Sequence, residues 1–281
     1  MPEIAYIDRS FIPLREAKVS VNDRGFLFAD SVYEMIVAYK GVPFKLENHL
    51  LRLAASAQAI NLKLPLSSSE IKKIVEEGVS RAGFEDTKIY LHITRGIAPR
   101  SHPFPVNAKA NFMATFRPKT ELPTNPRCNG VSVITTEDLR WAKCHIKSTG
   151  LLPNVLASQL AAEANAFEAI FVTASGIVQE GAASNIFIVR DGVVRTPGKT
   201  EKILSGVTRE VALQCARDAG YNALENKVQV QELWAAEEVF ITGTVIGILG
   251  VVQVDGKVIG SGLIGPVTKR IQQLFQALTL P

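Results

Sequence analysis

The sequence of 281 residues has few cysteines and no long uncharged apolar run. Its three cysteines, Cys128, Cys144 and Cys215, are odd in number and form no CxxC pair, so they predict neither a disulfide framework nor a zinc site. The longest uncharged stretch, residues 240–254, is shorter than the roughly 20 residues of a membrane helix. Several charged residues among the first twenty do not fit a signal peptide. We therefore expect a soluble protein of the reducing cytoplasm.

The sequence also has neither a basic block nor a glycine run of the kind that binds dinucleotides. Its formal net charge of +4 is spread along the chain, which argues against nucleic acid and membrane surfaces as partners. No GxGxxG run lies between a predicted strand and a predicted helix. Hydrophobic residues make up 47% of the chain and charged residues 21%, the ordinary balance of a globular protein. The length allows two modest domains.

Prolines mark the one candidate domain boundary. Residues 118–127 contain Pro118, Pro123 and Pro126 without a usable hydrophobic period, so they are predicted to form an interdomain linker. This prediction gives an N-terminal domain of residues 1–117 and a C-terminal domain of residues 128–281.

Hydrophobic periodicity predicts a mixture of helices and strands on both sides of this linker. Two hairpins are expected at the start, the second turning at Lys40-Gly41, and a capping box at Ser67 and Glu70 predicts a helix start. The predicted strands cover residues 4–14, 33–46, 89–94, 110–116, 131–135, 168–173, 185–190 and 238–242. The predicted helices cover residues 47–60, 67–81, 154–166, 207–219 and from about 266 onward. This order indicates a two-domain fold of the α/β and α+β type.

Lys147 is the first candidate for a chemical role. It lies in residues 144–150, where small and apolar neighbours could desolvate the amine, lower its pKa and make it a nucleophile. A stronger pattern begins at Glu180. Residues 180–187 (EGAASNIF), 194–196 (VRT) and 204–209 (LSGVTR) resemble the signature of fold type IV, or class IV, pyridoxal-phosphate-dependent aminotransferases. The resemblance continues through residues 23–25, 32–34, 49–53 and 146–148, and it is closest to D-amino acid aminotransferases.

This resemblance implies a smaller N-terminal α/β domain and a larger C-terminal domain with pyridoxal 5'-phosphate at their interface. It implies that Lys147 holds the cofactor as a Schiff base and afterwards moves a proton at the substrate α-carbon. Glu180 would face the pyridine nitrogen, because an anion there keeps the ring protonated. The implied phosphate ligands are a helix N-terminus, a second loop and one cation. These residues are Val207 and Thr208, Gly243 and Thr244, and Arg52.

The loop around Arg100 and His102 bears on the substrate. Its prolines Pro99, Pro103 and Pro105 restrict the backbone, so both side chains are displayed at little entropic cost. A guanidinium fork matches a carboxylate, and a histidine two residues later can add a donor. The Arg-x-His arrangement resembles the substrate-carboxylate site of D-amino acid aminotransferases, to which Tyr33 also contributes. In that family the arginine and the histidine reach the site of the neighbouring subunit, which implies a homodimer.

The resemblance therefore implies transamination between a D-amino acid of the D-alanine or D-glutamate type and a 2-oxo acid. Two alternatives share the fold, a branched-chain L-amino acid aminotransferase and an aminodeoxychorismate lyase, and a third is a catalytically silent cofactor-binding protein. The Arg-x-His loop argues against the first two. The sequence departs from the D-specific pattern at Ala182 and Ala183, where serines are frequent, and at Gly243, where a hydroxyl can contact the phosphate.

Overall fold

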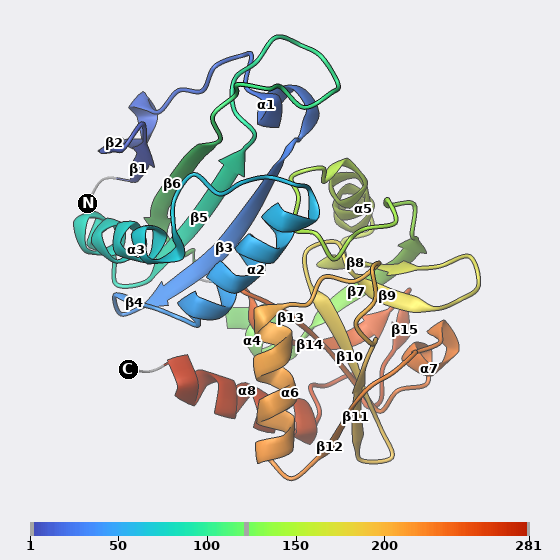
Figure 1. Ribbon diagram of the computed structural model, residues 1–281. Coiled ribbons are helices and arrows are strands. Elements are labelled where there is room, and N and C mark those ends of the chain that lie inside the picture. The colour runs from blue at the N-terminus through green and yellow to red at the C-terminus, as the bar shows by residue number, and fades with distance from the viewer. Residues whose placement is uncertain (1–2, 121–123, 280–281) are drawn as a thin grey trace. The chain divides into compact units, whose positions relative to one another are not determined.

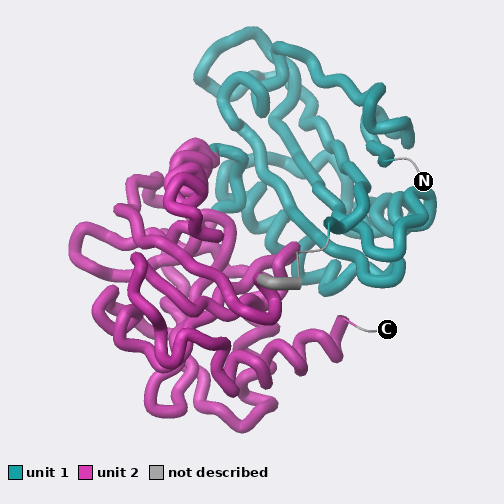
Figure 2. Tube along the Cα trace, turned by 180° about the vertical axis from the view of Figure 1, so that it is seen from behind, with its two compact units in different colours: residues 1–120, 146–150, 280–281 teal, residues 121–145, 151–279 magenta. Residues whose placement is uncertain are grey.

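The computed structural model describes residues 3–120 and 124–279, which form two compact units (Figures 1 and 2). Unit 1 contains residues up to 120 together with residues 146–150, and unit 2 contains residues 121–145 and 151–279. The segment that carries Lys147 thus clusters with unit 1, although it follows the predicted linker in the sequence. In the predicted division, this segment belongs to the C-terminal domain of residues 128–281.

Unit 1 is built on a six-stranded sheet with the order β2-β1-β6-β5-β3-β4, whose neighbouring strands are antiparallel. The turn between β3 and β4 lies at Lys40-Gly41, both with positive φ, as the sequence predicts for a tight hairpin. The capping box predicted at Ser67 and Glu70 is present at the start of α3. The elements are β1 (Ile4–Ile7), β2 (Ser10–Pro13), a 3-10 turn (Leu14–Glu16), α1 (Arg24–Phe28), β3 (Ser31–Tyr39), β4 (Val42–Pro43), α2 (Leu46–Ala59), α3 (Ser68–Ala82), β5 (Thr87–Thr94) and β6 (Asn111–Pro118).

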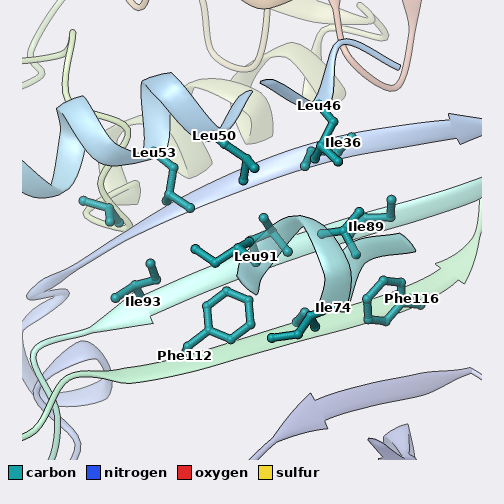
Figure 3. Packing of buried hydrophobic residues seen from close by; sticks show 14 of the residues in the cluster. Ile36, Leu46, Leu50, Leu53, Ile74, Ile89, Leu91, Ile93, Phe112 and Phe116 are labelled. Carbon is teal, nitrogen blue, oxygen red and sulfur yellow. The ribbon is translucent and has the colours of Figure 1, made fainter. Parts of the chain in front are cut away.

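The core of unit 1 lies between this sheet and the helices α2 and α3. The apolar residues at alternate positions of β5, namely Ile89, Leu91 and Ile93, are fully buried, which is the period of a strand with one covered face. Figure 3 shows these side chains together with those of α2 and of β6 in one apolar cluster. Tyr33 has the opposite parity from Val32 in β3, so it points to the other face of the sheet.

Unit 2 is built on a nine-stranded mixed sheet with the order β12-β11-β10-β13-β14-β7-β8-β9, and β15 pairs with β14. Parallel pairs join β14 to β7, β7 to β8 and β11 to β12. Its elements are α4 (Thr124–Asn129), β7 (Val131–Glu137), α5 (Leu152–Glu163), β8 (Glu168–Val172), β9 (Val178–Gly181), β10 (Asn185–Arg190), β11 (Val193–Thr196), α6 (Val207–Asp218), β12 (Asn222–Glu225), α7 (Val230–Trp234), β13 (Glu238–Gly243), β14 (Gly247–Val254), β15 (Lys257–Val258) and α8 (Pro266–Thr279).

The mixed two-domain fold agrees with the prediction, while one local expectation needs correction. The predicted linker falls partly on residues 121–123, which lie outside the described residues. Residues Thr124–Asn129 form the helix α4 rather than irregular chain. Pro126 is compatible with this helix because the first turn needs no N–H donor from it. Within residues 3–120 and 124–279, no helix is long and apolar enough to span a bilayer.

Candidate active site

Lys147 is held in unit 1 by its own backbone. Its carbonyl accepts a hydrogen bond from the Tyr33 N–H at 3.0 Å, and its N–H donates to Ser56 Oγ at 3.1 Å. The next residue, Ser148, forms a β-bridge with Val32. A strand and a helix of unit 1 therefore fix the backbone of this segment.

The side chain of Lys147 lies next to Tyr33. Its Nζ is 4.4 Å from the centre of the Tyr33 ring, a distance at which a cation is attracted to the aromatic face. Tyr90 lies beside Tyr33 with a ring separation of 5.5 Å, and burial, reinforced by Tyr33, raises the pKa of Tyr90 to about 12. The Tyr90 phenol therefore stays protonated at neutral pH. Two of the predicted site residues, Lys147 and Tyr33, are thus brought together within one unit.

Arg52 is placed by Glu34, a fully buried carboxylate on β3. Arg52 donates from Nε at 2.7 Å and from Nη2 at 2.9 Å to the two carboxylate oxygens. His49 Nδ1 lies 2.7 Å from the same carboxylate. Burial lowers the pKa of His49, so at neutral pH the ring is neutral and donates its Nδ1 proton to Glu34. The guanidinium that the sequence assigned to a phosphate thus has a rigid buried support.

We expect Glu34→Gln to lower the free energy of unfolding at neutral pH by up to about 3 kcal/mol. Burial raises the pKa of Glu34, but Arg52 and His49 outweigh burial and bring it down to about 2, against an ordinary value of 4.5. Because the pKa is depressed in the folded state, the stabilisation is fully present above about pH 4.5 and is lost as the pH falls toward 2. Denaturant titrations between pH 7 and pH 3 measure this dependence.

The matched control for this prediction is Glu77→Gln, which removes a carboxylate from the exposed pair of Glu77 with Arg81 on α3. The control should change stability by less than about 0.5 kcal/mol at every pH. A Glu34→Gln variant whose stability difference from the wild type stayed constant over this pH range would contradict the assigned ion pair.

Glu180 is held in unit 2 at the end of β9, where it is 5% exposed. One carboxylate oxygen accepts from Arg140 Nη1 at 2.6 Å, and the other accepts from Asn185 Nδ2 at 3.1 Å and from the Leu204 N–H at 3.0 Å. Arg140 also pairs with Asp138. Burial disfavours the charge on Arg140, but the carboxylates of Asp138 and Glu180 outweigh burial, so the pKa of Arg140 is raised above its usual value. The carboxylate of Glu180 is therefore held in one orientation by hydrogen bonds to both of its oxygens.

The N-terminus of α6 offers donors for an anion in unit 2. The first hydrogen bond of the helix runs from the Glu210 N–H to the Gly206 carbonyl, so the amides of Val207 and Thr208 precede it. No side chain of the described chain caps this end. A Cβ at Gly206 would lie 2.1 Å from the Asn185 side-chain oxygen, so only glycine leaves room for this amide.

The end of β13 carries the second predicted loop of unit 2. Gly243 and Thr244 are half-buried there, next to the buried Thr242. The Thr242 hydroxyl has no hydrogen-bond partner among the residues that the structure describes. Helix α6 packs against this strand. An unpaired buried hydroxyl beside a loop and a helix N-terminus is suited to an anionic ligand with several oxygen atoms.

Arg100 and His102 lie on the loop that joins β5 to β6 in unit 1, and both side chains are exposed. Their common neighbour is Phe28, whose ring centre is 5.3 Å from the Arg100 guanidinium carbon and 5.5 Å from the His102 ring centre. The structure thus brings both residues of the Arg-x-His arrangement onto one aromatic side chain.

Sequence reasoning missed the supporting residues of this site. Ser56, Arg140 and Asn185 were not assigned roles, and Glu34 entered only as part of a quoted motif. Nothing in the local pattern distinguishes Arg140 from a surface arginine, since its partner Glu180 lies 40 residues away. Asn185 stood inside the recognised signature, which was the one available signal.

Comparison with known proteins identifies the family of the chain. The sequence model of the family described as class IV aminotransferases matches residues 31–254. The chain is 41% identical over 261 residues to the D-alanine aminotransferase of Bacillus licheniformis, covering 93% of this chain and 92% of that one. The branched-chain amino acid aminotransferase of Escherichia coli superposes with a TM-score of 0.93 at 27% identity, covering 99% and 94% of the two chains. The T.th. branched-chain enzyme, solved with pyridoxamine 5'-phosphate, has a TM-score of 0.91 at 29% identity, covering 98% and 94%.

Proposed function

Because the chain belongs to the class IV aminotransferases, we propose that it transfers an amino group between a D-amino acid of the D-alanine or D-glutamate type and a 2-oxo acid. The observation that carries this proposal is the position of Lys147 Nζ, 4.4 Å from the Tyr33 ring centre. It places an amine next to a side chain proposed to bind the substrate carboxylate. The D-alanine aminotransferase of B. licheniformis, 41% identical to the chain, supports the choice of a D-amino acid.

Enzymes of this family use pyridoxal 5'-phosphate, which when bound withdraws electrons from the substrate α-carbon. The residues of this chain suit such a group. The amides of Val207 and Thr208 at the start of α6, the unpaired Thr242 hydroxyl and Thr244 offer donors for a phosphate. We assign Gly243 and Arg52 to the same phosphate. These donors compensate for the side-chain hydroxyls that Ala182, Ala183 and Gly243 do not supply.

The side chains of the chain carry out the remaining steps. We assign to Lys147 the covalent attachment of the cofactor and the movement of a proton to and from the substrate α-carbon. Glu180, paired with Arg140, would keep a proton on the pyridine nitrogen. Tyr33, Arg100 and His102 would bind the substrate carboxylate, since a phenol, a guanidinium and an imidazole are all donors to it.

The main alternative is a branched-chain L-amino acid aminotransferase, which the superposition on the E. coli enzyme favours. The lower identity of 27% to that enzyme, against 41% to the D-alanine aminotransferase, argues for the D-substrate. A panel of D-alanine, D-glutamate, L-alanine and L-leucine, each tested with pyruvate and 2-oxoglutarate, decides between them. A wild-type preference for the L-amino acids would refute the proposed function.

The proposal includes a homodimer in which Arg100 and His102 serve the neighbouring subunit. Helix α5 supports an assembly of this kind, because it packs on the sheet through its alanines and leaves larger apolar side chains exposed. Leu152, Val155 and Leu156 are 58 to 67% exposed, and Leu160 is 49% exposed. Residues four apart share one helix face, so these side chains form an apolar stripe that a second copy of the chain can cover.

We expect Glu180→Gln to retain the cofactor and to slow the half-reaction with the amino acid by at least about tenfold. A neutral amide no longer holds a proton on the pyridine nitrogen, and Arg140 loses a charged partner. Stopped-flow spectroscopy of the loaded enzyme measures the rate, and the phosphate content of the dialysed protein measures cofactor retention.

The control is Glu238→Gln, which also removes a buried carboxylate from unit 2. Glu238 accepts from the N–H groups of Val267 and Thr268 at the start of α8. Its replacement should lower stability and leave the half-reaction rate unchanged. If Glu180→Gln reacted as fast as the wild type, the role of Glu180 would be wrong.

A further inference from the structure

Arg24 is a buried arginine that binds the backbone of the loop carrying Arg100 and His102. It is 3% exposed. Its Nη1 donates to the Ser101 carbonyl at 2.5 Å and its Nη2 to the His102 carbonyl at 3.1 Å. One planar guanidinium thus holds two consecutive carbonyls, a geometry that a lysine cannot reproduce. The contact spans 77 residues of sequence and gives α1 a direct hold on this loop.

Asp30 connects Arg24 to a second buried arginine, Arg95. Asp30 accepts from Arg24 Nε at 2.8 Å and from Arg95 Nε at 2.8 and 3.0 Å. Arg95 also donates to the carbonyls of Ile60 and Asn61, which follow α2, and its guanidinium carbon lies 3.7 Å from the centre of the Phe104 ring. Through Arg24 and Arg95, Asp30 therefore supports both the Ser101–His102 backbone and the Phe104 side chain of this loop.

Phe28 contacts the side chains of this loop, whereas Arg24 binds its backbone. Its ring centre lies 4.9 Å from the Arg24 guanidinium carbon, and Arg100 and His102 contact the same ring. Two cations and an imidazole gathered on one aromatic ring have restricted orientations. The backbone of the loop is thus held by Arg24, and its two functional side chains are held by Phe28.

A loop held in its binding conformation favours ligand binding. An exposed arginine loses side-chain and loop entropy when it binds a carboxylate, and a loop held in its binding conformation loses less. We propose that Arg24, Phe28 and Asp30 are positioning residues that hold Arg100 and His102 in the conformation that binds the substrate α-carboxylate. This inference rests on the proposed function, which assigns carboxylate binding to these two side chains.

The test is a double-mutant cycle on the holoenzyme with the substrate that the wild type prefers. Phe28→Leu and Arg24→Lys are made in the wild type and in an Arg100→Ala/His102→Ala background. Phe28→Leu keeps a large apolar side chain and therefore decides the question even if Arg24→Lys does not fold. Phe26→Leu is the matched control, because Phe26 is 70% exposed on the same helix.

We expect Phe28→Leu to reduce kcat/KM about tenfold in the wild-type background, mostly through KM, and less than about twofold when Arg100 and His102 are already absent. Hydrogen exchange of the loop amides should be faster in Arg24→Lys than in the wild type, with exchange in β5 and β6 unchanged. Phe26→Leu should change neither measurement.

Equal losses of kcat/KM in the two backgrounds would overturn the inference, because they would show a role in stability rather than in positioning. A loss confined to kcat would also overturn it. The proposed function fails separately, if the wild type prefers L-amino acids in the panel described above.

Discussion

Lys147→Ala is expected to lower multiple-turnover transamination by at least about 10³-fold, because the variant has no amine placed to attach the cofactor and to move the α-proton. The fold should survive, since the hydrogen bonds of residue 147 to Tyr33 and Ser56 use its backbone. Steady-state assays measure the loss. Borohydride reduction followed by peptide mass spectrometry should find the cofactor on the Lys147 peptide of the wild type and on no peptide of the variant.

Lys143→Ala is the matched control, since Lys143 is an exposed lysine four residues earlier in the chain. It should retain full activity and covalent cofactor. A Lys147→Ala variant that still turned over at the wild-type rate, or a wild-type enzyme reduced at a different lysine, would show that the assignment of Lys147 is wrong.

Arg100→Ala is expected to raise the transition-state free energy for D-alanine by roughly 2–5 kcal/mol, as the loss of one partner from a desolvated charge pair does. Lys147 can deliver a proton to only one face of the substrate, so handedness depends on which pocket takes the carboxylate. In the D-amino acid aminotransferases that the sequence resembles, a tyrosine, an arginine and a histidine bind the carboxylate, so we expect Tyr33, Arg100 and His102 to select the D-amino acid.

The measurement is kcat/KM for D-alanine, L-alanine and L-leucine in the wild type and in the variant. The control is Arg15→Ala, which removes an arginine side chain that is 86% exposed in unit 1. The variant should lose activity toward D-alanine while the control keeps it. An Arg100→Ala variant indistinguishable from the wild type would remove the basis for carboxylate binding by this loop.

Mixed dimers test whether Arg100 acts on the neighbouring subunit. A hybrid of one Lys147→Ala subunit with one Arg100→Ala subunit contains one complete site only if Arg100 reaches across, because the intact Lys147 then meets the intact Arg100 of its partner. Mixing and refolding the two variants should therefore restore activity. Activity that stayed at the level of the separate variants would place Arg100 in the site of its own subunit.

Local patterns predicted much of the secondary structure, and the reason is physical. The alternation of Ile89, Leu91 and Ile93 and the capping box at Ser67 depend on neighbours a few residues away, so they are visible in the sequence. The helix α4 and the short helix α1 were not predicted. Helices of five or six residues are too short for a hydrophobic period to show.

The candidate site divides in the same way. Lys147, Glu180, Thr208 and Arg100 could be proposed from the sequence because each lies in a short recognisable motif. Their supports could not be proposed, because the partners are distant in the sequence. Arg140 lies 40 residues before Glu180, and Arg24 lies 77 residues before Ser101.

The sequence by itself determined the class of chemistry. Its motifs supply an amine to bind the cofactor, a carboxylate for the pyridine nitrogen and donors for a phosphate. Only the tertiary structure decided how each of these groups is held. In the tertiary structure, residues 146–150 cluster with unit 1 and Glu34 forms an ion pair with Arg52. Arg24 donates to the backbone of the loop that carries Arg100. Ion pairs and hydrogen bonds of this kind depend on distances of about 3 Å between segments far apart in the chain, and such distances exist only once the strands and helices have packed.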